Sequence, residues 1–268
     1  MDKVTVKDFF KLKEKNEPIV MITAYDYVSA RMADEAGVDA ILVGDSLSMV
    51  IQGHENTIPC TIDDVIYHTR LVRGGAKRAF LIADMPFLSY QVSIEEGIKN
   101  AGLLLKAGAE AVKIEGGREV KELVEKLVSY GIPVMGHIGM TPQHVYSFGG
   151  YKLQGKTEEQ KKRLLEDARI LEEAGVFSIV LEMIPAEVAK EITDSVKVPT
   201  IGIGAGPHCD GQVLVFHDLL GLYPDFRPSF AKAYRELYRE GLEGIREFTK
   251  EVKSRKFPDE KHYFKLSR

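Results

Sequence analysis

The sequence predicts a (β/α)8 barrel, the TIM-barrel fold of the α/β class. Strand-like apolar runs alternate with helical stretches, and seven such units are clear. Glycines at positions 37, 108, 131 and 175 stand between a helix and the next strand, where a left-handed residue ends a helix. Eight units in about 250 residues is the size of such a barrel. An open doubly wound sheet is disfavoured, because polar residues end nearly every strand instead of gathering at one switch point.

The elements follow in a regular order. A short amphipathic helix is expected over residues 5–15, ahead of the first strand. The expected strands cover residues 18–26, 39–46, 80–86, 111–117, 133–139, 178–185 and 199–206. The expected helices include residues 61–74, 93–107, 119–130, 158–174 and 186–196, and a helical stretch after the first strand ends at Ala36-Gly37. The glycine-rich stretch Ser147–Lys156 is expected to form a lid above the fifth strand.

The eighth unit is the least distinct. Residues 212–220 are the candidate strand, and a long helix is expected from near Pro228. Apolar residues recur in that helix at helical spacing and are expected to pack into the core: Tyr234, Tyr238, Leu242, Ile245, Phe248 and Val252. The whole chain, residues 1–268, is therefore expected to be one barrel domain.

The composition excludes several classes of protein. The chain is 44% hydrophobic and 28% charged with a formal net charge of −4, which gives no basic footprint for nucleic acid. No run approaches the roughly 20 apolar residues of a membrane helix, and the first residues lack the apolar core of a secretory signal. Cys60 and Cys209 are far apart and indicate neither a disulfide framework nor a zinc site. A cytoplasmic protein is expected.

The stretch Ala111–Gly117 carries two charges inside a buried strand. Side chains alternate along a strand, so Lys113 and Glu115 share one face and the apolar Val112 and Ile114 share the other. With helices on the outside, the two charges point into the barrel. Unpaired buried charges are costly, so this strand is predicted to belong to a functional site.

Other polar side chains end the neighbouring strands. Asp45 and Ser46 lie at the end of the expected second strand and Asp84 on the third, while His137 and Glu182 lie on the fifth and sixth. Neighbouring strands are about 4.8 Å apart, so Asp45, Asp84 and Glu115 are expected to converge. Three carboxylates so close would repel one another unless a cation lay among them, and oxygen ligands favour Mg²⁺.

Each of these residues also has a structural interpretation. Asp45 or Asp84 alone could cap a backbone turn, and Lys113 could simply pair with Glu115. A lone interior histidine such as His137 is more often structural than catalytic. Glu182 lies in an apolar run, a setting that suits a general base working near neutrality.

In order and spacing, the motifs of the chain resemble those of the ketopantoate hydroxymethyltransferase (3-methyl-2-oxobutanoate hydroxymethyltransferase) family. The resemblance runs from near the N-terminus to about Asp225. Its motifs are Val43-Gly-Asp-Ser-Leu47, Gln52-Gly-His54, Tyr67-His68, Ala83-Asp-Met-Pro-Phe87, Val112-Lys-Ile-Glu-Gly-Gly117, Gly136-His-Ile-Gly-Met-Thr-Pro142, Phe148-Gly-Gly-Tyr-Lys152 and Gly202-Ile-Gly-Ala-Gly206.

The resemblance implies a barrel of the phosphoenolpyruvate/pyruvate-like superfamily and a step of pantothenate and coenzyme A biosynthesis. In the family a hydroxymethyl group passes from 5,10-methylenetetrahydrofolate to 3-methyl-2-oxobutanoate through a metal-stabilised enolate, giving 2-dehydropantoate. By analogy, Asp45, Asp84 and Glu115 match the family's site for one Mg²⁺ per subunit. Members are commonly homodecamers.

The same analogy assigns the remaining roles. The residues Asp45, Ser46, Asp84 and Lys113 match the contacts of the oxoacid, and Glu182 matches the proton acceptor. His137 is a possible accessory residue that would position the ligand or a water.

Three alternatives remain open at this stage. The first is a Schiff-base aldolase with Lys113 as nucleophile, which the nearby Glu115 disfavours because it holds the lysine protonated. The second is a metal-dependent lyase on the same barrel that needs no folate. The third is a barrel that only binds a metabolite, for which the loss of an active-site acid would be expected, and none is missing.

Overall fold

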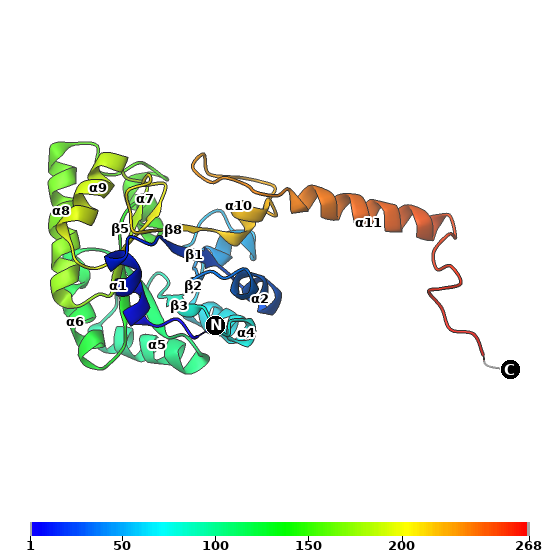
Figure 1. Ribbon diagram of the computed structural model, residues 1–268, viewed down its shortest axis with the longest axis horizontal. Coiled ribbons are helices and arrows are strands. Elements are labelled where there is room, and N and C mark those ends of the chain that lie inside the picture. Colours follow the sequence, from blue (N-terminus) through cyan, green and yellow to red (C-terminus); the bar gives the residue numbers. More distant parts are fainter. Residues whose placement is uncertain (1, 267–268) are drawn as a thin grey trace. The chain divides into compact units, whose positions relative to one another are not determined.

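A computed structural model describes residues 2–266 of the chain. Its eight strands form a closed parallel barrel in sequence order, which confirms the predicted fold class (Figure 1). The strands are β1 (Ile19–Thr23), β2 (Ala40–Val43), β3 (Phe80–Asp84), β4 (Ala111–Glu115), β5 (Val134–Gly139), β6 (Ser178–Glu182), β7 (Thr200–Ile203) and β8 (Gly211–Leu214).

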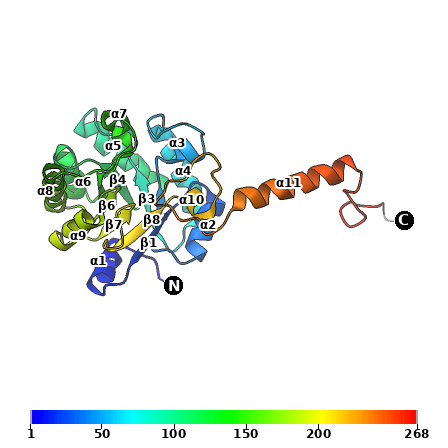
Figure 2. The same ribbon diagram turned by 90° about the horizontal axis from the view of Figure 1, so that it is seen from above.

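Helices surround the strands, as Figure 2 shows for the ring of α2, α4, α5, α6, α8 and α9. The α-helices are α1 (Val6–Glu14), α2 (Tyr27–Glu35), α3 (Leu47–Val50), α4 (Ile62–Gly75), α5 (Ile94–Ala107), α6 (Lys121–Ser129), α7 (Val145–Phe148), α8 (Glu158–Ala174), α9 (Ala186–Ser195), α10 (Phe216–Leu220) and α11 (Leu237–Lys253). Two short 3-10 helices, η1 (Arg118–Val120) and η2 (Pro142–His144), follow β4 and β5.

Local sequence signals set many of these boundaries. The Thr61 side chain accepts a hydrogen bond from the Asp64 N–H at the start of α4, and Asp64 bonds back, which completes a capping box. At the start of α5, Ser93 accepts from the Glu96 N–H. Glycines 37, 108, 131 and 175 all adopt positive φ between a helix and the next strand, as predicted.

Helix α1 closes the end of the barrel where the strands begin. Phe9 is fully buried and makes edge contacts with Phe80, the first residue of β3, and with Phe177, just before β6. The Lys13 ammonium lies 2.8 Å from an Asp210 carboxylate oxygen beside the start of β8. Because this end is packed with apolar side chains, the opposite end is the one left for a site.

The barrel is sealed where β8 pairs with β1. Ile19 is in register with Gly211, and a Cβ on that glycine would lie 2.5 Å from the Ile19 carbonyl oxygen. Residue 211 must therefore be glycine for the two edge strands to meet. The predicted eighth strand is thus present, but it spans only the start of residues 212–220, since residues 216–220 form α10.

The C-terminal part of the chain differs from expectation. The chain divides into two compact units, Met1–Phe216 and His217–Arg268. The long helix begins at Leu237 instead of near Pro228, and it has no buried residue. The prediction that its apolar stripe packs into the core was wrong, because helical spacing reveals that a face is apolar but not what covers it.

Candidate active site

The structure brings the predicted polar residues together at the carboxyl end of the strands. Asp84, Glu115 and Glu182 are the last residues of β3, β4 and β6, and Asp45 follows β2 by two positions. Lys113 and His137 lie within β4 and β5. Five of these side chains are at most 5% exposed: Asp45, Asp84, Lys113, Glu115 and His137. Such burial of charge requires compensation by partners within the site.

Lys113 is the centre of the charged cluster. Its ammonium lies 2.8 Å from Asp84 Oδ1, because Asp84 and Lys113 are in register on neighbouring strands. Glu115 Oε1 is farther away, at 3.9 Å. Burial by itself would lower the pKa of Lys113, but Asp84, Glu115 and Asp45 outweigh it and raise that pKa. A lysine held protonated in this way is a poor Schiff-base nucleophile, which disfavours the aldolase alternative.

His137 links this cluster to Glu182. Its Nδ1 lies 3.2 Å from the Lys113 ammonium and 3.5 Å from Glu115 Oε1, while its Nε2 lies 3.2 Å from Glu182 Oε2. Burial and the charge of Lys113 oppose protonation of the ring, but Glu115 and Glu182 favour it and raise the pKa of His137 to about 9. His137 Nε2 is thus an ion-pair partner of Glu182, although it is buried and makes no hydrogen bond of good geometry within residues 2–266. His137, for which the sequence favoured a structural role, therefore contacts both Lys113 and Glu182.

The carboxylates differ in their electrostatic environment. Burial, followed by the charges of Asp84 and Glu115, raises the pKa of Asp45 well above its usual range. Burial also raises the pKa of Asp84, against the opposing effect of Lys113. Burial acts the same way on Glu115, but His137, Lys113 and the Gln143 N–H reverse the direction and lower its pKa. A cation among the three would relieve their mutual repulsion.

One oxygen each of Asp84 and Glu115 accepts a hydrogen bond from the backbone, and the other does not. Asp84 Oδ2 accepts from the Asp45 N–H at 2.9 Å, and Glu115 Oε2 accepts from the Gln143 N–H at 3.0 Å. Asp84 Oδ1 and Glu115 Oε1 are buried and have no hydrogen-bond partner of good geometry within residues 2–266. Within the same residues, no group of three or more His, Cys, Asp and Glu side chains is placed so that it could hold a metal ion by itself. By donor chemistry alone, the three carboxylates suit Mg²⁺, with other ligands to be supplied by water or substrate.

Sequence reasoning missed Gln143, Tyr25 and Tyr90. The Gln143 amide donates to Asp45 Oδ2 at 3.0 Å, and the Tyr25 hydroxyl lies 2.8 Å from Ser46 Oγ. The Tyr90 hydroxyl lies 3.0 Å from the Glu115 carbonyl oxygen. No local pattern marks these residues, because each acts across strands on a neighbour that is distant in sequence.

The segment predicted as a lid lies near Glu182. Its start, residues 147–148, belongs to α7, and the remainder is loop that crosses toward α3 and β6. The Tyr151 hydroxyl lies 3.5 Å from Met49 Sδ, and the Gln154 N–H donates to the Met183 carbonyl oxygen. Burial, followed by the charge of Glu182, raises the pKa of Tyr151.

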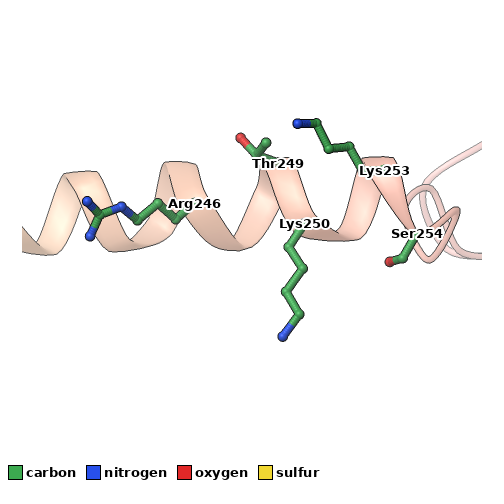
Figure 3. A pocket seen from close by; sticks show the side chains of 5 residues that line it. All are labelled: Arg246, Thr249, Lys250, Lys253 and Ser254. Carbon is green, nitrogen blue, oxygen red and sulfur yellow. The ribbon is translucent and has the colours of Figure 1, made fainter.

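Two hollows in the molecule are separate from the charged cluster. One, of about 410 Å³, is lined by residues that include Ile138, Phe148 and Leu164. Ile138 alternates with His137 on β5, so this cavity lies on the helix side of the barrel wall. The other, of about 490 Å³, borders α11, and Figure 3 shows its side chains spreading in different directions from one helix, with Lys250 pointing away from Thr249 and Lys253. Neither contains a predicted site residue.

Comparisons with known proteins show the family of the chain. Residues 3–260 match the sequence profile of the family described as ketopantoate hydroxymethyltransferase. A 3-methyl-2-oxobutanoate hydroxymethyltransferase of Thermosipho melanesiensis is 56% identical over 98% of this chain and 99% of its own length. That of Thermotoga neapolitana is 59% identical over 97% of this chain and 96% of its own.

The similarity of this chain to solved structures shows the fold alone. The crystal structure of 2,3-dimethylmalate lyase, a PEP mutase/isocitrate lyase superfamily member, superposes with a TM-score of 0.60 at 17% identity. The match covers 95% of this chain and 90% of that one. This agrees with the predicted (β/α)8 barrel.

Proposed function

The chain belongs to the ketopantoate hydroxymethyltransferase family, and from that premise we propose how its buried charged cluster acts. The chain is a one-carbon transferase of pantothenate biosynthesis that acts on 3-methyl-2-oxobutanoate. One observation carries the mechanism: an unbroken series of contacts runs from Asp84 through Lys113 and His137 to Glu182. An anchor for a substrate anion and a base thus lie in one network.

In the proposed complex, the oxoacid contacts Asp45, Ser46, Asp84 and Lys113. The Lys113 ammonium is the positive group of the site and attracts the anionic substrate. Ser46 donates to the substrate carboxylate, and the Tyr25 hydroxyl 2.8 Å away fixes the direction of the Ser46 side chain. The substrate is thereby held in one orientation before any bond changes.

The proposed metal residues are Asp45, Asp84 and Glu115, holding one Mg²⁺ per subunit. Asp84 Oδ1 and Glu115 Oε1 support this assignment, because neither makes a hydrogen bond of good geometry within residues 2–266, although Lys113 Nζ lies 2.8 Å from Asp84 Oδ1. When bound, the cation would act as a Lewis acid that polarises the substrate carbonyl and acidifies the C3 proton. We expect EDTA to abolish turnover and Mg²⁺ to restore it, whereas trapping of substrate on Lys113 by borohydride would support the Schiff-base mechanism instead.

Glu182 is the proposed general base. It takes the C3 proton of the oxoacid, and the charge that develops on the enolate oxygen is stabilised by the Lys113 ammonium. His137 is a positioning residue, because its Nε2 lies 3.2 Å from Glu182 Oε2 and holds that carboxylate in place. The C3 carbanion then forms a bond to the one-carbon unit.

We propose 5,10-methylenetetrahydrofolate as the donor of that unit. The atoms balance when one water supplies the hydroxyl oxygen and tetrahydrofolate leaves. Two measurements separate the removal of the C3 proton from the transfer of the one-carbon unit. Exchange of the C3 proton of 3-methyl-2-oxobutanoate with deuterated water should require the enzyme and Mg²⁺ but no folate, whereas the appearance of 2-dehydropantoate should require all three. Exchange that is absent under every condition would overturn the role of the site in proton removal.

Self-association is a further part of the proposal. Apolar side chains on α11 are exposed, among them Ile245 at 65% and Phe248 at 54%. Covering such a stripe with the same surface of a second copy removes apolar area from water. We therefore propose that the chain forms a homo-oligomer, with a decamer as the specific expectation.

We also propose a cytoplasmic location. Within residues 2–266, no helix has the length and apolar character needed to span a bilayer. Cys60 and Cys209 are free thiols, as is usual in a reducing compartment. Fractionation of cells that produce the protein would test this part directly.

A further inference from the structure

We propose that Gln143 is a positioning residue that holds Asp45 and Glu115 where they can share a cation, an inference that rests on the metal site proposed above. Gln143 lies in η2, just beyond the end of β5, and is 4% exposed. It does not belong to the strands that carry the three carboxylates. Its contacts nevertheless reach the ends of β2, β3 and β4.

Gln143 binds two of the three carboxylates directly. Its side-chain Nε2 donates to Asp45 Oδ2 at 3.0 Å, and its backbone N–H donates to Glu115 Oε2 at 3.0 Å. A second Nε2 hydrogen bond, 2.9 Å long, goes to the Met85 carbonyl oxygen, next to Asp84. One residue therefore fixes the positions of carboxylates that come from separate strands.

The surroundings also fix the orientation of the Gln143 amide. The two groups beside Nε2, the Asp45 carboxylate and the Met85 carbonyl, can only accept, whereas Oε1 lies 2.8 Å from the Tyr90 hydroxyl, which can donate, and 3.1 Å from the Gln91 side-chain nitrogen. If the amide were flipped, its oxygen would face the Asp45 carboxylate, and the two oxygens would repel each other. Every donor of the amide is used, and its oxygen accepts twice, so the side chain has one arrangement.

The consequence for a cation follows from the oxygens that Gln143 leaves uncovered. It binds Glu115 through Oε2 alone, and Glu115 Oε1 has no hydrogen-bond partner of good geometry in the described part of the chain. Without the side-chain amide, Asp45 Oδ2 would lose its donor in a buried place, and the carboxylate would be free to turn. Removing partners of this kind from metal ligands typically weakens metal affinity by about 10- to 100-fold.

The test uses the Mn²⁺ affinity of the full chain, measured by electron paramagnetic resonance without substrate. Gln143→Met keeps the length of the side chain but removes both donors, and we expect Mn²⁺ to bind about 10- to 100-fold more weakly. Gln91→Leu is the matched control, because Gln91 contacts Gln143 but neither carboxylate. We expect parental Mn²⁺ affinity in that control.

Gln143→Asn extends the test in case the Met variant does not fold. It retains an amide on a stem one methylene shorter, which can no longer reach Asp45, while the backbone bond to Glu115 persists. We expect a loss of Mn²⁺ affinity without a matching fall in the melting temperature of the metal-free protein.

Parental Mn²⁺ affinity in a folded Met or Asn variant would overturn this inference and leave the metal site standing. An equal loss of affinity in the Gln91→Leu control would also overturn it, since the effect would then belong to the loop as a whole. A parent chain that binds no Mn²⁺ would instead overturn the metal site itself, and this inference with it.

Discussion

The barrel interior and helix α11 depart from the usual distribution of side chains in opposite ways. The interior buries five charged or titratable groups, from Asp45 to His137, at the carboxyl ends of its strands. Helix α11 buries no residue and exposes apolar side chains such as Ile245 and Phe248. Each departure costs free energy in an isolated chain, so each needs a partner.

The kind of partner differs between the two regions. The buried charges have most of their partners inside the chain, including the 2.8 Å contact of Lys113 with Asp84, and the oxygens left over are suited to a cation. The apolar side chains of α11 require a surface that removes them from water, for which a second copy is proposed. The buried charges of the barrel therefore suggest a catalytic site, and the exposed apolar side chains of α11 suggest a contact between subunits.

The largest expected effect lies in the barrel interior. Glu182→Gln removes the proposed base while keeping the size of the side chain, so we expect turnover to fall by about three orders of magnitude or more. Mn²⁺ affinity should barely change, because Glu182 is not among the proposed metal residues. Steady-state kinetics and metal titration check the two parts, and near-normal turnover would remove Glu182 from the role of base.

Asp84→Ala tests the other end of the same network. It removes the nearest partner of Lys113 and one proposed metal residue together. We expect Mg²⁺-dependent binding of 3-methyl-2-oxobutanoate to fall below detection by calorimetry. Unchanged binding in the presence of Mg²⁺ would contradict the assignment of Asp84 to the metal and the substrate.

A substitution on α11 tests the assembly side of the comparison. Ile245→Lys puts a charge into the exposed apolar stripe, and we expect self-association to weaken at least about 10-fold, since burying such a side chain contributes about 1.5–3 kcal/mol. Glu247→Gln is the matched control, because it changes the charge equally on the opposite side of the helix. Sedimentation of both variants gives the result, and equal masses would argue against the stripe as a contact.

The smallest expected effect concerns a buried carboxyl in the C-terminal unit. Burial raises the pKa of Asp218 from its ordinary 3.8 to about 6, and the charge of Arg227 only partly opposes this. Because the folded-state pKa is the higher one, the stabilising contribution is complete below pH 3.8 and is lost as the pH rises through 6. Asp218→Asn should therefore stabilise the protein by about 1–2 kcal/mol at pH 7.5, allowing for solvent screening.

The same substitution should have little effect near pH 4, where the carboxyl of the folded parent is already protonated. Thermal melts of the parent and the variant at the two pH values provide the comparison. An equal change at both would mean that the ionisation of Asp218 does not contribute to stability.

Strand alternation was sufficient to predict much of the site. It placed Lys113 and Glu115 on the inner face of β4, and both are buried there among charged partners. The order of strand and helix likewise predicted that Asp45, Asp84 and Glu182 would lie at the carboxyl ends of strands, and Asp84 and Glu182 end β3 and β6 while Asp45 follows β2 by two positions. Their catalytic and metal roles are the proposals that the substitutions at Glu182 and Asp84 test.

The sequence by itself determined the barrel, the family and the set of charged residues at the carboxyl ends of the strands. These depend on residue spacing within single elements and on short motifs. Only the tertiary structure revealed that Asp84 lies closer than Glu115 to Lys113, that His137 joins Lys113 to Glu182, and that Gln143 binds two carboxylates. It also showed that the last helix begins at Leu237 and has no buried residue. Periodicity specifies the face on which a side chain lies, whereas its partners depend on how distant strands and loops meet in space.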